Sequence, residues 1–383
     1  MNLTVSARIA GGAIFTIALL GILVFSGLSG ISSINDGLVR VTDESTPMLE
    51  ETSHVMTSLL KATVAVNNFH QEMELDKLQT NKDIFSEQQK QNTKSSKYLA
   101  QLSAGHSAID SSFSKSKKVI KEYFGLVPQS FQLHQQDLTL QAQLEEKQVE
   151  FEDAADELDS LLSDFSDEAK SKQVSDNASA LSSMVTEATV TITDSLAIAE
   201  LPQVLTAQNE IDTLMSDFNR RFGVISKDRS AQRNEYFYDT LVAIDIFKNI
   251  VIGNSSILFL LEEQLKTKQQ AKQELVKSAQ VADQALVALE VVAKGVSSFN
   301  ASIKQEASEN VASSRTLMIG LAIMAILVAV GINTVVLKSI RGPLAEVLRA
   351  MTQVASGDLK TQVEVRSDDE IGKLSAGINK CNK

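Results

Sequence analysis

The densest recognition chemistry in this sequence lies in the stretch SKDRSAQRNEYFYD, residues 226–239. Arg229 and Arg233 are four residues apart, a spacing that would place both guanidinium groups on one face of a helix. An arginine fork suits a carboxylate, and Tyr236 combines an apolar ring with a polar hydroxyl. The stretch therefore predicts a site for a small anionic ligand, and the competing interpretation is a solvated face near the start of a helix.

A second candidate ligand site is the segment VNNFH at residues 66–70, where Asn67 and Asn68 form an unusual pair for a helix interior. The competing interpretation is a polar stripe that faces water. The net charge of −12 would steer cations toward the protein, whereas a local arginine pair favours an anion at contact distance. The ligand class thus stays open among organic acids, amino acids and amines.

Residues for catalysis or metal binding are sparse and scattered. The four histidines stand apart in the sequence, and the single cysteine, Cys381, has no partner for a disulfide or a zinc site. We therefore expect no enzyme activity, no catalytic residues, no cofactor and no metal. A nucleic-acid partner is not expected either, because no run of Lys and Arg is longer than a pair such as Arg220 and Arg221.

Two apolar stretches could each cross a bilayer. Residues 9–28 form a mostly apolar stretch of 20, which spans about 30 Å as a helix. Residues 316–337 form an uncharged stretch of 22. The alternatives are a buried core helix for either stretch, or a cleavable signal peptide for the first one. The second stretch favours a protein with two membrane spans.

Basic residues beside the spans predict the topology. Arg8 precedes the first span, and Lys338, Arg341 and Arg349 follow the second. The positive-inside rule then places both ends in the cytoplasm and the segment between the spans outside it. The predicted divisions are a cytoplasmic N-terminus (1–8), a first span (9–30), a periplasmic sensor domain (31–315), a second span (316–337) and a C-terminal domain (338–383).

The segment between the spans is predicted to be helical, because helix breakers are few. Expected breaks fall at Gly105, at 125–128, at Pro202, at Gly223 and at 253–256. Two stacked four-helix bundles on long first and last helices fit these breaks better than one bundle. An apolar seam continues without a breaker into the second span, which predicts one unbroken helix and a contact between two chains. Its members are Leu275, Ala279, Ala282, Leu286, Leu289, Ala293 and Val296.

The C-terminal domain reads as helix, extended connector and second helix. Pro343 is expected to open the first helix, and Gly357 is expected to end it. The acids DDE at 368–370 suit a helix start, and Ile371 begins the apolar seam of the second helix. Two such helices with the same direction cannot bury their seams alone, so a homodimer would form a parallel four-helix bundle.

This arrangement resembles the HAMP linker of bacterial receptors, on the motifs SGDL at 356–359 and DDEIGKL at 368–374. The resemblance implies that Pro343, Gly357 and Glu370 are the diagnostic positions, with Glu370 tying the end of the connector to the bundle. Together with the spans, the chain resembles the front half of a methyl-accepting chemotaxis protein with a helical bimodular sensor domain. The HAMP helix is about a turn short, and the methylation and kinase-contacting parts are absent from the sequence.

The resemblance implies an all-α receptor in the bacterial inner membrane, multi-pass, which binds a small molecule in the periplasm and passes a conformational change to HAMP. We expect coupling to a kinase only if the signalling domain is present. Two alternatives remain: the sensor half of a transmembrane histidine kinase, and a membrane coiled-coil scaffold that senses nothing.

Overall fold

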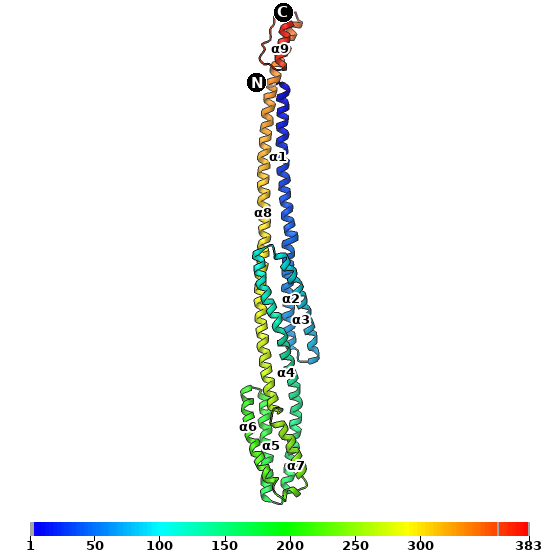
Figure 1. The fold of residues 1–383 in the computed structure, drawn as a ribbon, viewed down its shortest axis with the longest axis vertical. Coiled ribbons are helices and arrows are strands. Elements are labelled where there is room, and N and C mark those ends of the chain that lie inside the picture. The colour runs from blue at the N-terminus through cyan, green and yellow to red at the C-terminus, as the bar shows by residue number, and fades with distance from the viewer. Residues whose placement is uncertain (1–3, 358–359, 382–383) are drawn as a thin grey trace. The chain divides into compact units, whose positions relative to one another are not determined.

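The computed structural model describes residues 4–357 and 360–381, and every regular element within them is a helix. The described residues contain no β-strand, which confirms the predicted all-α class. The elements in chain order (Figure 1) are α1 (Val5–Arg40), the π-helical turn η1 (Val41–Ser45), α2 (Thr46–Gln71), the 3-10 turn η2 (Leu75–Lys77), α3 (Leu78–Ser103), α4 (Ser107–Asp167), α5 (Lys172–Ile198), α6 (Leu201–Ile225), the 3-10 turn η3 (Ala231–Arg233), α7 (Phe237–Val251), α8 (Ile257–Ala355) and α9 (Glu370–Cys381).

The chain divides into two compact units, one made of residues 1–47 and 296–383 and the other of residues 48–295. The 99-residue helix α8 contributes to both units, and it runs without interruption through the predicted second span. The sequence predicted this continuity from the absence of a breaker before residue 316.

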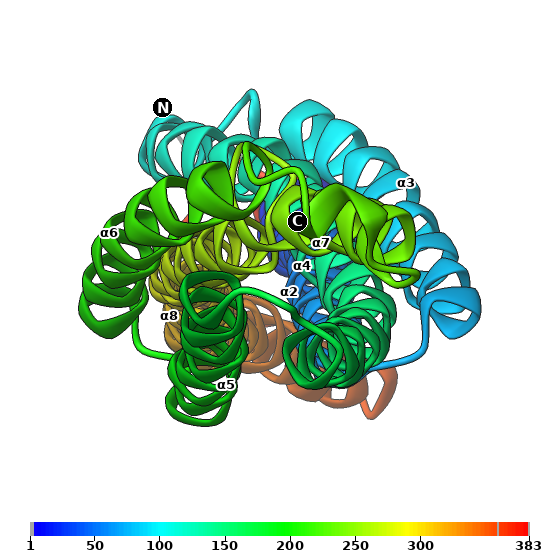
Figure 2. The ribbon, with the colours of Figure 1, turned by 90° about the horizontal axis from the view of Figure 1, so that it is seen from below.

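One part of the unit 48–295, which we call the apolar layer, has a core of large apolar side chains. It consists of residues 151–167 of α4, all of α5, α6 and α7, and the first turns of α8. Figure 2 shows α4, α5, α6 and α7 end on around a common centre. Apolar residues recur every three or four positions, as an amphipathic helix requires. Its fully buried members include Leu158, Leu162, Leu181, Ile192, Val204, Phe218, Phe247 and Ile257.

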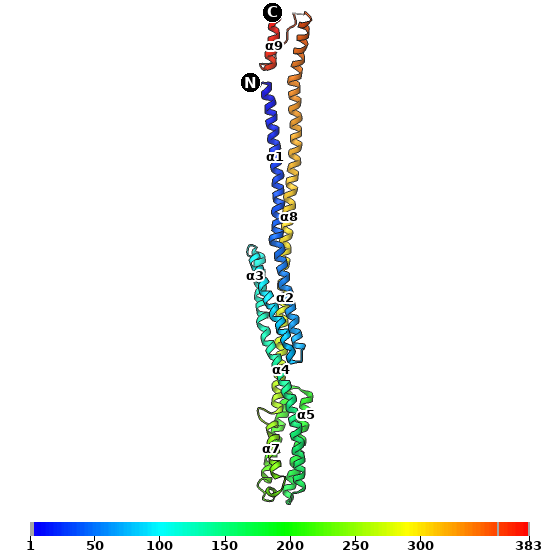
Figure 3. The same ribbon diagram turned by 90° about the vertical axis from the view of Figure 1, so that its right-hand side faces the viewer.

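The other part of this unit, which we call the polar layer, buries many polar side chains among its apolar ones. It consists of α2, α3, residues 107–140 of α4 and residues 264–295 of α8; Figures 1 and 3 show α2 and α3 beside α4. The buried polar residues are Thr52, Ser58, Asn92, Ser96, Ser103, Ser116, Ser130, His134, Asp137, Gln264, Thr267 and Ser278. The polar layer contains four helical segments and the apolar layer contains five, so the second predicted bundle has one helix more than expected.

Hydrogen bonds between helices satisfy several of the buried polar groups in the polar layer. Asn92 on α3 donates its Nδ2 to the Val55 carbonyl of α2 at 2.9 Å and to the Ser58 hydroxyl at 3.0 Å. Gln264 on α8 donates to the Asp137 carboxylate of α4 at 2.7 Å. Burial raises the pKa of Asp137. Polar groups inside this bundle therefore tie specific helices together, since an unpaired one would be costly.

The predicted break at residues 125–128 is wrong, because α4 continues through Pro128. Proline removes one helix hydrogen bond and costs about 3 kcal/mol in a helix interior. The buried neighbours Tyr123, Phe124, Val127 and Phe131 hold the same helix in the core on both sides of the proline. Packing thus overrides the local preference, while Pro128 itself faces outward.

The other predicted breaks have mixed outcomes. Gly105 lies in the turn between α3 and α4, Pro202 lies in the first turn of α6, and residues 252–256 separate α7 from α8. Helix α6 continues through Gly223 and ends two residues later. A break after α2 was not predicted; there, Glu72 turns its carboxylate back to accept hydrogen bonds from the next two backbone amides.

The predicted seam of residues 275–296 matches the buried face of α8 only in part. Ala282, Leu289 and Val296 have no exposed surface, whereas the fully buried Ala285 and Val292 each lie one residue before a predicted seam position. The other predicted members are half-buried: Leu275, Ala279, Leu286 and Ala293. The spacing therefore predicted a buried stripe that is displaced by about one residue, and the contact between two chains stays a prediction.

In the unit formed by residues 1–47 and 296–383, α1 packs antiparallel against α8 at glycines. A Cβ added at Gly12 would lie 2.7 Å from Ile332, and one at Gly30 would lie 3.1 Å from Ser314. At Gly37 the same atom would lie 3.2 Å from Ala307. Small residues at such contacts let two helices approach closely, as they do in membrane bundles.

The apolar windows of these helices have mean hydropathies of 2.3 and 2.5, and only 6% and 0% of their residues are buried. A core helix of a soluble bundle would hide its apolar side chains, so the buried-core alternative does not fit. Long helices with exposed apolar surface fit a surrounding of lipid.

Between α1 and α2 the helix widens into the π-helical turn η1, just before Pro47. Proline has no N–H to donate, and its ring would clash with the carbonyl four residues earlier. The Thr46 amide bonds instead to the Val41 carbonyl, five residues back. One wide turn therefore accommodates Pro47, a known response of a helix to such a clash.

Candidate functional site

The C-terminal helix pair has two helix ends fixed by specific residues. α8 ends at Ala355, and Gly357 follows with φ +99°, a left-handed conformation that glycine adopts without strain. At the start of α9, the Asp369 carboxylate accepts hydrogen bonds from the backbone amides of Ile371 and Gly372, both at 3.1 Å. The predicted ends are confirmed, although part of the SGDL motif, residues 358–359, lies outside the described residues.

The prediction that Pro343 opens a helix is wrong, because Pro343 lies inside α8. The helix arrives from the apolar span already formed, and one missing N–H at this position interrupts only a single bond of the ladder. Proline at a helix start and proline within a continuing helix have the same sequence signature here, so the pattern could not separate them.

The connector between the helices is held by Asn379, a residue the sequence analysis missed. Its side chain accepts a hydrogen bond from the Val363 amide and donates one to the Val363 carbonyl, both at 2.7 Å. This two-way bond mimics a strand pairing and fixes the depth at which Val363 enters the small core. That core contains Val347, Ala350, Val363 and Ile378, with Val354 and Ile371 packed at its edge.

Glu370 contacts the first turn of α1. Its carboxylate accepts a hydrogen bond from the Val5 amide at 2.8 Å and one from the Ser6 hydroxyl at 3.1 Å. The Val5 bond contributes most to holding the pKa of Glu370 below its ordinary value. A carboxylate at a helix N-terminus is favoured by the free N–H groups and by the helix dipole. The resemblance implied a tie from Glu370 to the bundle, and the geometry adds a tie to α1.

The two helices of the unit 1–47 and 296–383 also share a polar cluster beyond the apolar windows. Asn310 of α8 donates to the Ser33 hydroxyl of α1 at 2.9 Å. Arg40 of α1 pairs with Glu306 of α8 at 3.2 Å. This hydrogen bond and this ion pair depend on the relative position of α1 and α8.

The predicted ligand site at residues 226–239 does not form a helix face. Asp228 accepts hydrogen bonds from the Ser230 and Ala231 amides, which turns the chain before η3. Arg229 lies in that turn and Arg233 ends η3, and both are exposed. The aspartate two residues before a serine is a turn signal that the sequence contained.

Tyr236 lies in surroundings that disfavour an anion. It packs against the apolar layer, and its neighbours Glu235 and then Asp164 raise the pKa of its hydroxyl. Asn67 and Asn68 lie on α2, as predicted, and both face away from the core. None of these residues lines the α5–α6 cleft or the groove between α3 and α4.

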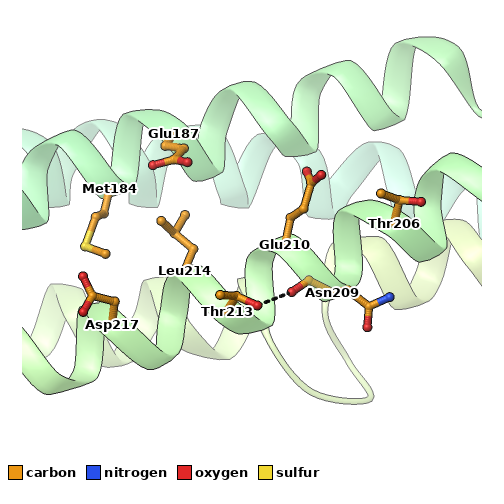
Figure 4. A pocket seen from close by; sticks show the side chains of 8 residues that line it. All are labelled: Met184, Glu187, Thr206, Asn209, Glu210, Thr213, Leu214 and Asp217. Atoms are coloured by element: carbon orange, nitrogen blue, oxygen red, sulfur yellow. Dashed lines mark hydrogen bonds between the residues drawn. The ribbon is translucent and has the colours of Figure 1, made fainter.

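A cleft with a volume of about 600 Å³ lies between α5 and α6. Figure 4 shows its lining, with the Thr213 hydroxyl bonded to the Asn209 carbonyl and three carboxylates around the opening. One of these, Asp217, is engaged by Arg221 and Arg220, whose hydrogen bonds lower its pKa. The lining consists of Met184 and Glu187 of α5 and Thr206, Asn209, Glu210, Thr213, Leu214 and Asp217 of α6.

Two histidines lie close together in the polar layer, the half-buried His70 at the end of α2 and the buried His134 on α4. The His70 Nε2 lies 2.6 Å from the Ser130 hydroxyl, and the His134 Nε2 lies 3.0 Å from the Glu72 carbonyl. Because a carbonyl only accepts, His134 donates through Nε2. The two rings are 4.8 Å apart. Burial, and then the neighbouring His134, lower the pKa of His70 to about 4.

Comparison with known proteins identifies the C-terminal domain. Residues 335–380 match the HAMP domain family. Among solved structures, the sensor domain of the V. parahaemolyticus histidine kinase sensor TorS is similar, with a TM-score of 0.49 and 10% identity, over 63% of this chain and 97% of that one. No curated protein matches. The HAMP domain and the two long apolar helices make this chain a membrane protein of signal transduction.

Proposed function

We propose that this chain is the sensor and relay half of a transmembrane chemoreceptor in the bacterial inner membrane. Its helical unit would lie in the periplasm and bind a small molecule, and a shift of α8 against α1 would reach HAMP. The observation that carries the proposal is α8 itself, which runs unbroken from the core of the helical unit, through an apolar span, into the first HAMP helix.

The HAMP geometry supports a relay in which α1 also takes part. Glu370 bonds the first turn of α1, so a movement of α8 relative to α1 would strain or release this contact. A ligand can bias such a movement only through different affinities for the two arrangements.

Exposed apolar side chains support a homodimer. Leu344, Leu348, Met351 and Leu374 of the HAMP helices are 43% to 65% exposed in one chain. A second copy in parallel would cover this face with a matching one, as the four-helix bundle of the resemblance requires.

Two chimeras test the output class. Residues 1–383 would be joined to the signalling domain of a known chemoreceptor and, separately, to the catalytic core of a known histidine kinase. If only the chemoreceptor chimera controls its kinase, the proposal is supported. If only the histidine kinase chimera controls its own kinase activity, the chain is instead the sensor half of a histidine kinase.

A disulfide tests the relay. In a Cys381→Ser background, Ser33→Cys and Asn310→Cys would place two thiols at a contact that is 2.9 Å between side-chain atoms. Oxidation should fix the output of the active chimera at one level, and reduction should restore it. The control pair Ser29→Cys and Asn310→Cys shifts one thiol by a helical turn. Unchanged output after complete oxidation of the first pair would contradict a relay by relative movement of α1 and α8.

A further inference from the structure

A groove of about 360 Å³ lies between α3 and α4 in the polar layer. Its volume is at the small end of the range for ligand sites, about 300–1,000 Å³, and a single-ring molecule fits inside it, since a cavity of about 150 Å³ already holds benzene. The residues that line it are Lys82, Phe85, Ser86 and Gln89 of α3, and Pro128, Phe131, Gln132 and Gln135 of α4.

The floor of the groove is aromatic. The rings of Phe85 and Phe131 meet edge to face with centroids 5.3 Å apart, and Phe131 packs on Phe69 at 4.1 Å. These rings are almost fully buried, so their positions are set by the core and not by solvent. Pro128 adds a rigid apolar edge on α4. A flat apolar body is the shape that such a floor accepts best.

The charge of the groove is positive, in contrast to the acidic protein around it. Lys82 is the one charged residue in the lining. Its ammonium donates to the Gln135 side-chain oxygen at 2.8 Å and lies 5.5 Å from the centre of the Phe69 ring. Both partners are neutral, and no ion pair among the described residues includes Lys82. An incoming carboxylate would replace the amide oxygen with a full opposite charge.

The remaining polar groups favour one carboxylate over two and reject amines. The amides of Gln89 and Gln132 are exposed at the groove and can donate to a second carboxylate oxygen. A second carboxylate on the ligand would find no second cation, and an ammonium group would find no acid. The α5–α6 cleft, with three carboxylates, has the opposite preference.

From these features we infer that the α3–α4 groove binds a small monocarboxylate with a flat apolar body, such as an aromatic acid. The inference deepens the proposed sensor function and rests on it for its role in signalling. A bound ring would contact Phe131, which packs on Phe69. The Phe69 ring in turn lies against the His134 ring, with centroids 5.6 Å apart. The occupant would therefore stabilise the cluster that joins α2, α3 and α4.

Calorimetric titration of benzoate into the full chain in lipid nanodiscs tests the inference. Benzoate should bind, and benzylamine should not. Lys82→Gln should weaken benzoate binding at least tenfold, because a charge-assisted hydrogen bond is lost, and Lys82→Arg should retain most of the affinity. The matched control is Lys90→Gln, an exposed lysine on α3 outside the groove, which should leave the affinity unchanged.

Three results would overturn the inference: no benzoate binding at millimolar concentration, equal binding of benzylamine, or equal loss of affinity in the Lys82 and Lys90 variants. Hydrogen exchange of α3 and α4 in each variant identifies a folding defect, and rescue by Lys82→Arg excludes one for the glutamine variant. Failure here with kinase control still present in the chimeras would remove this groove but leave the proposed receptor function intact.

Discussion

The apolar layer and the polar layer share helices α4 and α8 but use different ways to hold them. In the apolar layer, interdigitated Leu, Ile, Val and Phe side chains fill the centre. In the polar layer, Asn92, His70, His134 and the Gln264–Asp137 pair form hydrogen bonds between segments, while several buried hydroxyls bond a carbonyl of their own helix. Apolar packing is strong and non-directional, whereas buried hydrogen bonds contribute little net stability but specify which groups meet. The apolar layer is thus suited to stability, and the polar layer to a structure that a ligand or a proton can alter.

The largest expected effect is a loss of stability confined to the apolar layer. Phe218 has no exposed surface, so Phe218→Ala should cost about 3–5 kcal/mol through lost burial and a new cavity. Amide hydrogen exchange of the full chain in nanodiscs should show lower protection in α5 and α6, with protection in α2 and α3 retained. Equal loss in both layers would break the comparison, because it would make them one cooperative unit.

Acid should weaken the polar layer selectively. The pKa of His70 is lowered to about 4, so the unfolded state binds more protons than the folded state between pH 6.5 and pH 4. Stability contributed by neutral His70 is present above pH 6.5 and is lost as the pH falls toward 4. The loss is at most about 3 kcal/mol, and solvent screening of this partly exposed ring makes it smaller. The raised pKa of Asp137 acts in the opposite direction.

Exchange protection of α2 and α4 measured from pH 7 to pH 4 checks this expectation. His70→Gln should flatten the pH dependence, and His54→Gln, on the surface of the same helix, should not. A pH response of the apolar layer of the same size would show that the buried histidines are not its cause.

A smaller effect should follow removal of one buried amide. Asn92→Ala would leave the Val55 carbonyl and the Ser58 hydroxyl without this donor inside the core, at a cost of about 1–3 kcal/mol. Asn209→Ala, on the exposed face of α6, should change stability by less than about 0.5 kcal/mol. Urea-dependent exchange of α2 and α3 measures the difference. A cost near zero for the buried site would mean that water replaces the lost amide.

The smallest expected effect should be the same in both layers. Gly125 in α4 and Gly223 in α6 lie in helix interiors, with open space where a Cβ would stand. Each Gly→Ala substitution should stabilise its helix by about 0.5–1 kcal/mol, as a rise in exchange protection would show. Equal gains in stability would mean that the two layers differ in their cores and not in helix propensity.

Sequence patterns predicted what depends on spacing along one helix. The all-α class and the unbroken α8 follow from few breakers, and periodicity predicted the buried stripe of α8 at residues 275–296 to within about one residue. Two of the failures share one physical cause, which is that a partner distant in sequence decides the outcome. Pro128 stays helical because Phe131 and its neighbours are packed, and Asn379 matters only because Val363 lies beside it.

The expected helix face at the predicted ligand residues is wrong for a local reason. Arg229 and Arg233 have the spacing of a helix face, but Asp228 turns the chain before η3, and both arginines are exposed. The groove between α3 and α4 combines residues about 45 positions apart, so one local stretch could not reveal it. The relay position Glu370 was predicted from resemblance, whereas its contact with Val5 could not be.

The crowding at Gly372 has a genetic consequence. A Cβ at this position would overlap the carbonyl oxygen of Ser367, in a buried part of the turn into α9. Every missense codon change at a glycine adds a Cβ, so no substitution reachable by mutation fits without moving the backbone. Random mutagenesis of the gene should thus yield alleles at position 372 that do not signal, although their protein still reaches the membrane and the unit of residues 48–295 keeps full exchange protection. Such alleles would separate a defect in the HAMP relay from a defect in the helical unit, and the comparison needs no knowledge of the ligand.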